Sequence, residues 1–144
     1  MRFMVLVKAN KDSEAGALPS GEILATMGAF NEELAKAGVM LAGEGLQASS
    51  KGCRLRFDGG GKHTVTDGPF TESKELIAGF WIIQVRSKEE AIEWMSRAPF
   101  GEGEELEIRQ VFEASDFPQD IFPAEAQEAE QELRDRLQGQ YSNS

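Results

Sequence analysis

Residues 78–86, AGFWIIQVR, form the most strongly apolar stretch of this 144-residue chain, and they constrain its fold more than any other segment. Because side chains alternate between the two faces of a strand, Phe80 and Ile82 lie on one face and Trp81 on the other. The apolar run at residues 3–7, FMVLV, alternates in the same way. Both patterns predict central strands of a sheet that are apolar on both faces.

Two amphipathic helices are predicted between strands. Ser20 is a suitable N-cap and Gly38 a suitable C-terminal glycine for the first helix. The apolar residues of this helix recur at helical spacing: Ile23, Met27, Phe30 and Leu34. Ser87 and Glu90 have the spacing of a capping box and open the second helix, which Pro99 ends.

The remaining segments complete a β-α-β, hairpin, β-α-β order. Further strands are predicted at residues 39–46 and 106–112, and a hairpin at residues 54–66 around the turn Asp58-Gly59-Gly60-Gly61. This order predicts an α+β fold: a ferredoxin-like split βαβ antiparallel sheet with an added hairpin. We expect one domain over residues 1–113. Residues 114–144 form a C-terminal extension with a helix at residues 123–137 and a disordered tail.

The two-sided apolar strands also predict a partner. Two helices cover only one face of the sheet, and leaving large apolar side chains open on the other face forfeits about 1.5–3 kcal/mol each. A second copy of the chain is the simplest cover, which predicts a homodimer in the form of an α+β barrel. The alternative is that the helix at residues 123–137 folds over that face, although its apolar stripe is thin and rich in alanine.

Composition narrows the possible partners and compartment. The net charge of −10 disfavours nucleic acid, since no basic patch interrupts it. Cys53 is the only cysteine, which excludes an intrachain disulfide and fits a reducing compartment. The apolar run at residues 3–7 is too short for a signal or a membrane span. We therefore expect a cytoplasmic protein without a membrane partner.

Residues 65–79, VTDGPFTESKELIAG, resemble the signature of the YCII-related family, in its DGPF-motif subgroup. The matching residues are Asp67, Gly68, Pro69, Phe70, Glu72, Lys74, Glu75 and Gly79. The resemblance covers about residues 1–113, and Gln110 departs from it where proline is common. It implies a dimeric α+β barrel with a cleft near the motif and, from the family's gene context, a functional link to a sigma factor. It implies no settled activity.

Asp67 is the first candidate for chemistry. A carboxylate desolvated in a cleft gains a pKa suited to general acid–base catalysis, whereas the alternative is that Asp67 accepts hydrogen bonds in the turn at Gly68 and Pro69. His63 is a weaker catalytic candidate, because four residues of strand place it about 13 Å from Asp67. The candidates for ligand binding are Lys8, Phe70, Glu72, Lys74 and Trp81. Each has a structural alternative, namely a solvated strand end, surface ion pairs or core packing.

Several functions are disfavoured by absent motifs. The run at residues 58–63 lacks the spacing of a phosphate-binding loop, and no GxGxxG sequence opens a helix. One histidine and one cysteine cannot form a zinc cluster, so we expect no cofactor, while a carboxylate-only Mg²⁺ or Ca²⁺ site stays open. The sequence favours a small-molecule-binding or sigma-factor-associated accessory module. The alternative is a cofactor-free lyase or isomerase that uses Asp67 as its acid or base.

Overall fold

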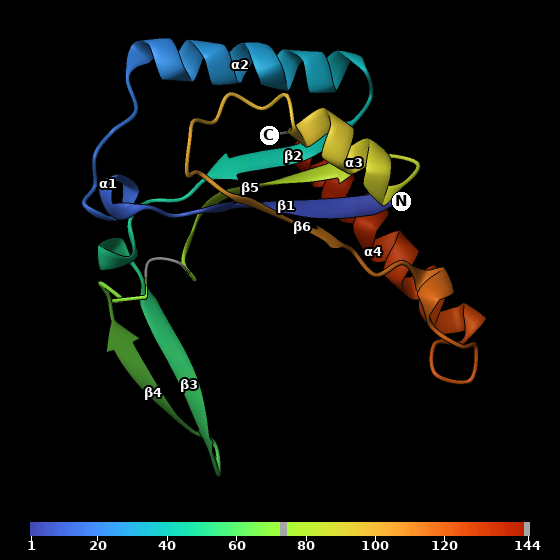
Figure 1. Cartoon of the computed structure of the whole chain (residues 1–144). Helices are drawn as coiled ribbons and strands as arrows, with labels where there is room; N and C mark the ends of the chain where they lie inside the picture. The colour runs from blue at the N-terminus through green and yellow to red at the C-terminus, as the bar shows by residue number, and fades with distance from the viewer. Residues whose placement is uncertain (73–74, 143–144) are drawn as a thin grey trace. The chain divides into compact units, whose positions relative to one another are not determined.

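The computed structural model describes residues 1–72 and 75–142 (Figure 1). The chain divides into two compact units, Met1–Val111 and Phe112–Ser144. No helix among the described residues is both long and apolar enough to cross a membrane.

The first unit contains a four-stranded antiparallel sheet with the strand order β2-β5-β1-β6. Its strands are β1 (Arg2–Lys8), β2 (Met40–Gly45), β5 (Ile77–Gln84) and β6 (Leu106–Gln110). The helix α2 (Gly21–Lys36) connects β1 to β2, and α3 (Lys88–Met95) connects β5 to β6. This is the ferredoxin-like split βαβ topology, and the predicted α+β fold class is confirmed.

The helices α2 and α3 cover the same face of the sheet (Figure 1). Each begins as predicted, since Ser20 Oγ accepts a hydrogen bond from Ile23 N and Ser87 Oγ accepts one from Glu90 N. The buried core on this face consists of Phe3, Val5, Phe30, Leu34, Val39, Trp81, Ile83, Val85, Ala91 and Met95. Ile23, which the helical spacing places on the apolar stripe, is 53% exposed. The stripe therefore reaches the core only from its second turn onward.

The register of β1 with β5 places the remaining apolar side chains of these two strands on the face of the sheet opposite α2 and α3. Met4 is paired with Ile82 and Leu6 with Phe80, and all four side chains are half-buried. The charged residues of β6, Glu107 and Arg109, are in register with the same two β1 residues. The two-sided apolar pattern is therefore present in the sheet, and the homodimer that we inferred from it stays a prediction.

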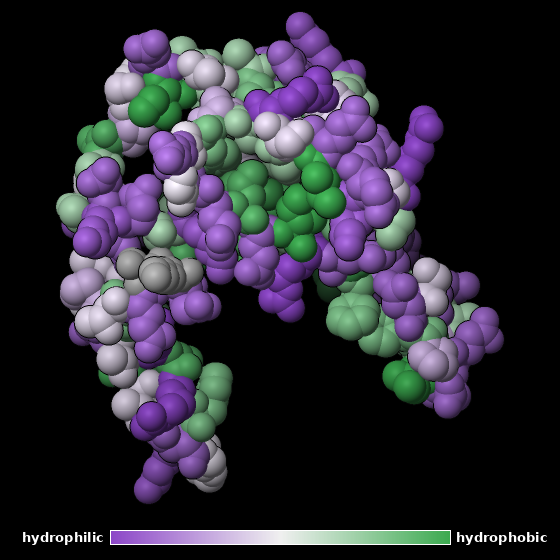
Figure 2. Space-filling view, viewed as in Figure 1, coloured by the Kyte–Doolittle hydropathy of each residue, from purple (hydrophilic) through white to green (hydrophobic). Residues whose placement is uncertain are grey.

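The inserted hairpin consists of β3 (Cys53–Gly59) and β4 (Lys62–Asp67), which form a separate two-stranded sheet projecting from the domain (Figure 1). Every residue of the two strands is exposed. Leu55 is opposite Val65 and Phe57 is opposite His63, so the apolar side chains share one face of the hairpin. Figure 2 shows apolar residues along one side of this hairpin and hydrophilic residues along the other.

The segment between β1 and α2 is partly helical. It contains a short helix, α1 (Lys11–Glu14), whose capping box joins Asn10 and Ser13. A helix of four residues has too few apolar positions to produce a periodic pattern, so only the capping residues mark it in the sequence. Another short element, the 3-10 helix η1 (Ser49–Lys51), precedes the hairpin.

The second unit contains the 3-10 helix η2 (Ala114–Asp116) and the helix α4 (Ala124–Ser142). Three aromatic rings cluster before α4: the centroids of Phe112 and Phe117 are 5.0 Å apart, and those of Phe117 and Phe122 are 6.0 Å apart. The helix continues to Ser142, beyond the predicted end at residue 137, so the predicted disordered tail is helical up to that residue.

Candidate functional site

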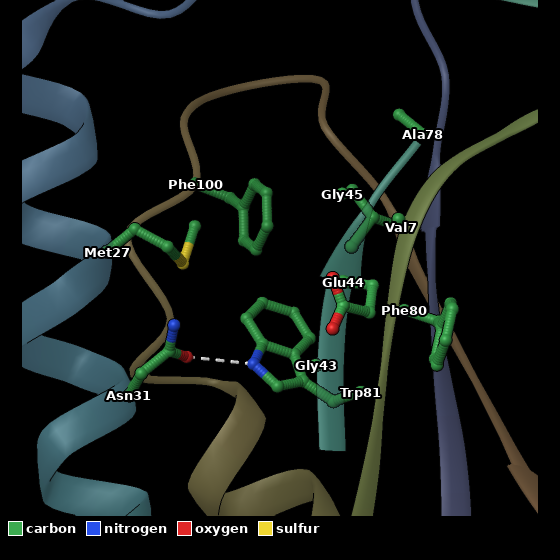
Figure 3. Close-up of a pocket in the computed structure, with 11 residues that line it drawn as sticks. Val7, Met27, Asn31, Gly43, Glu44, Gly45, Ala78, Phe80, Trp81 and Phe100 are labelled. Atoms are coloured by element: carbon green, nitrogen blue, oxygen red, sulfur yellow. Dashed lines mark hydrogen bonds between the residues drawn. The ribbon is translucent and has the colours of Figure 1, made fainter. Parts of the chain in front are cut away.

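A cavity of about 270 Å³ lies between α2 and the sheet (Figure 3). The described residues that line it are Val7, Met27, Asn31, Gly43, Glu44, Gly45, Ala78, Gly79, Phe80, Trp81 and Phe100. They come from α2, from β1, β2 and β5, and from the loop that follows α3. In Figure 3 the side chains of Met27, Asn31 and Phe100 face Trp81, whereas Phe80 lies on the opposite side of β5. This is a concave, mostly apolar site with few polar groups, which is typical of small-molecule pockets.

Trp81 is held in one orientation at the base of the cavity. Its indole Nε1 donates a hydrogen bond to Asn31 Oδ1 at 2.8 Å. The rings of Phe30 and Phe100 meet the indole edge to face, with centroid distances of 6.0 Å and 6.2 Å. Edge-to-face contacts and a satisfied indole N–H are the favoured environment for a buried tryptophan. The cavity therefore has a rigid aromatic wall.

Two glycines shape the strands beside the indole. A Cβ at Gly43 would lie 2.9 Å from Trp81 Cδ1, so glycine is what lets the indole lie against β2. A Cβ at Gly79 would lie 2.9 Å from the backbone oxygen of Glu44, so β2 and β5 could not keep this spacing with a side chain there. Gly45, opposite Gly79 in the ladder, has open space around the position of a Cβ.

The residues of the DGPF motif have a different place in the fold. A Cβ at Gly68 would overlap the carbonyl oxygen of Ser49 and lie 2.6 Å from its carbonyl carbon. Gly68 N donates to the Gly52 carbonyl at 3.0 Å, and Phe70 N donates to Ser49 Oγ at 3.0 Å. The ring of Phe70 packs under the guanidinium of Arg54, 3.8 Å from the ring centroid. The motif therefore fastens the base of the hairpin to η1.

Glu14 extends this attachment to α1. Its Oε2 accepts a hydrogen bond from Ser49 N at 2.7 Å. Hydrogen bonds from the Ser49 side chain and then from its backbone N–H lower the pKa of Glu14 below its ordinary value. The second oxygen, Oε1, is buried and has no hydrogen-bond partner among the described residues. A carboxylate at the end of α1 is thus part of the support beneath the motif.

The predicted catalytic residues are both on the hairpin. Asp67 ends β4 opposite Cys53, and His63 lies on the same strand opposite Phe57. Both are exposed, and neither is among the residues that line the cavity. The two candidates are therefore placed together on one strand, outside the cavity.

The predicted ligand-binding residues are dispersed. Trp81 lines the cavity, and Phe70 is half-buried at the base of the hairpin. Lys8 forms an ion pair with Glu107 at 3.2 Å at the end of β1, and Glu72 is exposed. Lys74 lies outside the described residues. Among the four members of this set that the structure describes, only Trp81 lines the cavity.

Sequence reasoning missed the polar residue of the cavity, Asn31. It lies four residues after Met27 and three before Leu34, so it is a polar residue on the apolar side of α2. Such an interruption is the signal that could have identified it. Phe100, in the Gly-rich loop after α3, carried no periodic signal. No group of three or more potential metal ligands occurs among the described residues.

The topology and the cavity together define an antiparallel α+β domain with a ligand-sized cavity between its sheet and a helix. The model of the YCII-related domain matches residues 1–115, and the chain belongs to the YCII-related family. Membership of the DGPF subgroup stays a prediction.

Comparisons with individual proteins give a more distant picture. No curated protein matches the chain. Seven chains among the solved structures match. One of them is the 5-chloro-2-hydroxyhydroquinone dehydrochlorinase (TftG) from Burkholderia phenoliruptrix AC1100 in complex with 2,5-dihydroxybenzoquinone. Its identity to this chain is 17% and its TM-score is 0.40, with 80% of this chain and 98% of that chain covered.

Proposed function

We propose that this YCII-related protein binds a small organic molecule in the cavity between α2 and the sheet. The observation that carries the proposal is the cavity itself: about 270 Å³, with a fixed indole on one wall and an amide side chain beside it. Its size is close to the lower end of ligand pockets, which hold about 300–1,000 Å³. A core without a ligand to accommodate would fill such a space with side chains.

Binding without turnover agrees best with the lining. Among the described residues that line the cavity, Glu44 is the only one with a side chain that readily takes up or releases a proton. General acid–base catalysis needs a positioned partner within hydrogen-bond reach of the reacting atoms. The enzyme based on Asp67 would need that carboxylate beside its substrate, whereas Asp67 is exposed on β4. An association with a sigma factor stays a prediction from the family resemblance.

A fragment screen by NMR tests the proposal. The Trp81 indole N–H resonance is the reporter, and the Trp94→Phe variant assigns it by removing the other indole in the chain. We expect aromatic fragments at millimolar concentration to shift this resonance, because the indole lines the cavity. A screen in which no fragment of any class shifts it would contradict the proposal.

Two variants locate the binding. Gly45→Leu adds a side chain where a Cβ meets open space, so it should fill part of the cavity and weaken binding at least tenfold. Asp67→Asn, on the hairpin, should leave binding unchanged. Loss of binding in Asp67→Asn together with normal binding in Gly45→Leu would move the site from the cavity to the hairpin.

A further inference from the structure

We propose that the cavity selects a flat, uncharged aromatic compound that carries a hydrogen-bond acceptor such as a carbonyl oxygen, and that Asn31 is the residue that recognises the acceptor. The inference rests on the proposed binding function of the same cavity and specifies the chemical class of its ligand.

The orientation of the Asn31 amide is fixed by its neighbour. An indole N–H only donates hydrogen bonds, so Asn31 must present its oxygen to Trp81 Nε1, as the 2.8 Å bond shows. The amide nitrogen then faces away from the indole, and Figure 3 shows it on the side of Met27 and Phe100. This nitrogen has no hydrogen-bond partner among the described residues. Two N–H donors are therefore available to an acceptor on a bound molecule.

The walls around the amide favour an aromatic ring. Trp81 and Phe100 meet edge to face. In this arrangement each ring still has surface that an aromatic ring of a ligand can contact. The thioether of Met27 lies beside them and makes favourable contacts with aromatic rings. The volume of about 270 Å³ limits the ligand to a compound of about one or two rings.

Charge excludes anionic ligands. Glu44 is the only charged residue among the described residues of the lining, and no lysine, arginine or histidine is among them. A carboxylate or phosphate group would therefore enter an apolar site without a cation to pair with. Glu44 lies opposite Phe80 in the ladder between β2 and β5, so its side chain starts on the face of the sheet away from Trp81.

Three single-ring probes separate these features in the NMR titration of the Trp81 indole resonance. The probe 4-hydroxyacetophenone is neutral and has a carbonyl acceptor, 4-ethylphenol lacks the carbonyl, and 4-hydroxybenzoate is an anion. We expect 4-hydroxyacetophenone to bind about tenfold more tightly than 4-ethylphenol, which corresponds to one net hydrogen bond, and 4-hydroxybenzoate to bind most weakly.

Asn31→Asp is the matched variant, because it keeps an oxygen for the Trp81 N–H and removes the two amide donors. The tenfold preference should disappear in this variant while the Trp81 indole N–H keeps a hydrogen-bond acceptor. If Asn31→Asp does not fold, Asn31→Leu also removes the two donors at a similar volume; because it removes the acceptor of the Trp81 N–H as well, only the ratio of the two affinities is compared in this variant.

The outcomes distinguish this inference from the proposed function. Equal affinities of the wild type for 4-hydroxyacetophenone and 4-ethylphenol, or an undiminished preference in the Asn31 variants, would overturn the role of Asn31 while leaving a small-molecule site. Tightest binding of 4-hydroxybenzoate would overturn the exclusion of anions. Failure of all three probes and of the whole fragment screen would overturn both proposals.

Discussion

Gly79→Ala is expected to destabilise the protein, whereas Gly45→Ala, on the adjacent strand, is not. These two glycines face each other in the ladder between β2 and β5. A Cβ at Gly79 would lie 2.9 Å from the Glu44 carbonyl oxygen, and a Cβ at Gly45 would meet nothing within 4 Å. Because the obstructing atom belongs to the backbone, a rotamer change cannot relieve the contact, and β2 must move away from β5.

The two substitutions share one stabilising effect. Replacing glycine by alanine reduces the conformational entropy of the unfolded chain and raises the free energy of unfolding by about 0.4–1 kcal/mol. Overpacking a well-packed site costs about 1–3 kcal/mol. We expect Gly45→Ala to gain about 0.5 kcal/mol and Gly79→Ala to lose about 1.5 kcal/mol. The difference of about 2 kcal/mol isolates the contact with the Glu44 carbonyl.

Thermal unfolding measures this difference. At this chain length 1 kcal/mol corresponds to about 3–4 °C, so the Tm of Gly79→Ala should lie about 6–8 °C below that of Gly45→Ala. Circular dichroism at 222 nm follows the transition, and denaturant unfolding gives the free energies independently. Equal Tm values for the two variants would refute the reasoning, because they would show that β2 yields to a side chain at no cost.

Two further predictions concern the support beneath the motif. Gly68→Ala should release the base of the hairpin from Ser49 and accelerate amide hydrogen exchange at positions 68 and 70 by about 10- to 100-fold. Gly52→Ala is the control and should not accelerate exchange, because its Cβ would lie 3.8 Å from the Ser49 oxygen, an ordinary contact distance. Similar exchange rates in the two variants would contradict this role of Gly68. Glu14→Gln should make the free energy of unfolding less sensitive to acid. Because the pKa of Glu14 is lowered in the folded protein, the carboxylate stabilises the fold fully above its ordinary pKa of 4.5. This stabilisation is lost as the pH falls through the lower pKa of the folded state. Urea unfolding between pH 5 and pH 3 checks this, and parallel curves for wild type and variant would count against it.

The fold could be predicted from the sequence because its signals are local. The continuous apolar run at residues 78–86 predicted a strand with apolar side chains on both faces. The pairing of β5 with β1 agrees with this prediction. Ser20 and Ser87 marked the starts of α2 and α3, because a hydroxyl that accepts a backbone N–H acts within three residues. The order of these elements along the chain then predicted the ferredoxin-like topology.

The cavity could not be predicted in the same way, because its parts meet only in the folded chain. Asn31 and Trp81 are 50 positions apart, and nothing in the local sequence of either residue predicts a hydrogen bond between them. Position 68 of the motif requires glycine because a Cβ there would overlap the carbonyl oxygen of Ser49, which belongs to another element of the chain. By itself the sequence determined which elements form and which faces are apolar, since those follow from residue spacing. Only the tertiary structure decided that the unfilled space lies beside Trp81 and that the Asn31 amide faces it, since both depend on the distance between packed elements.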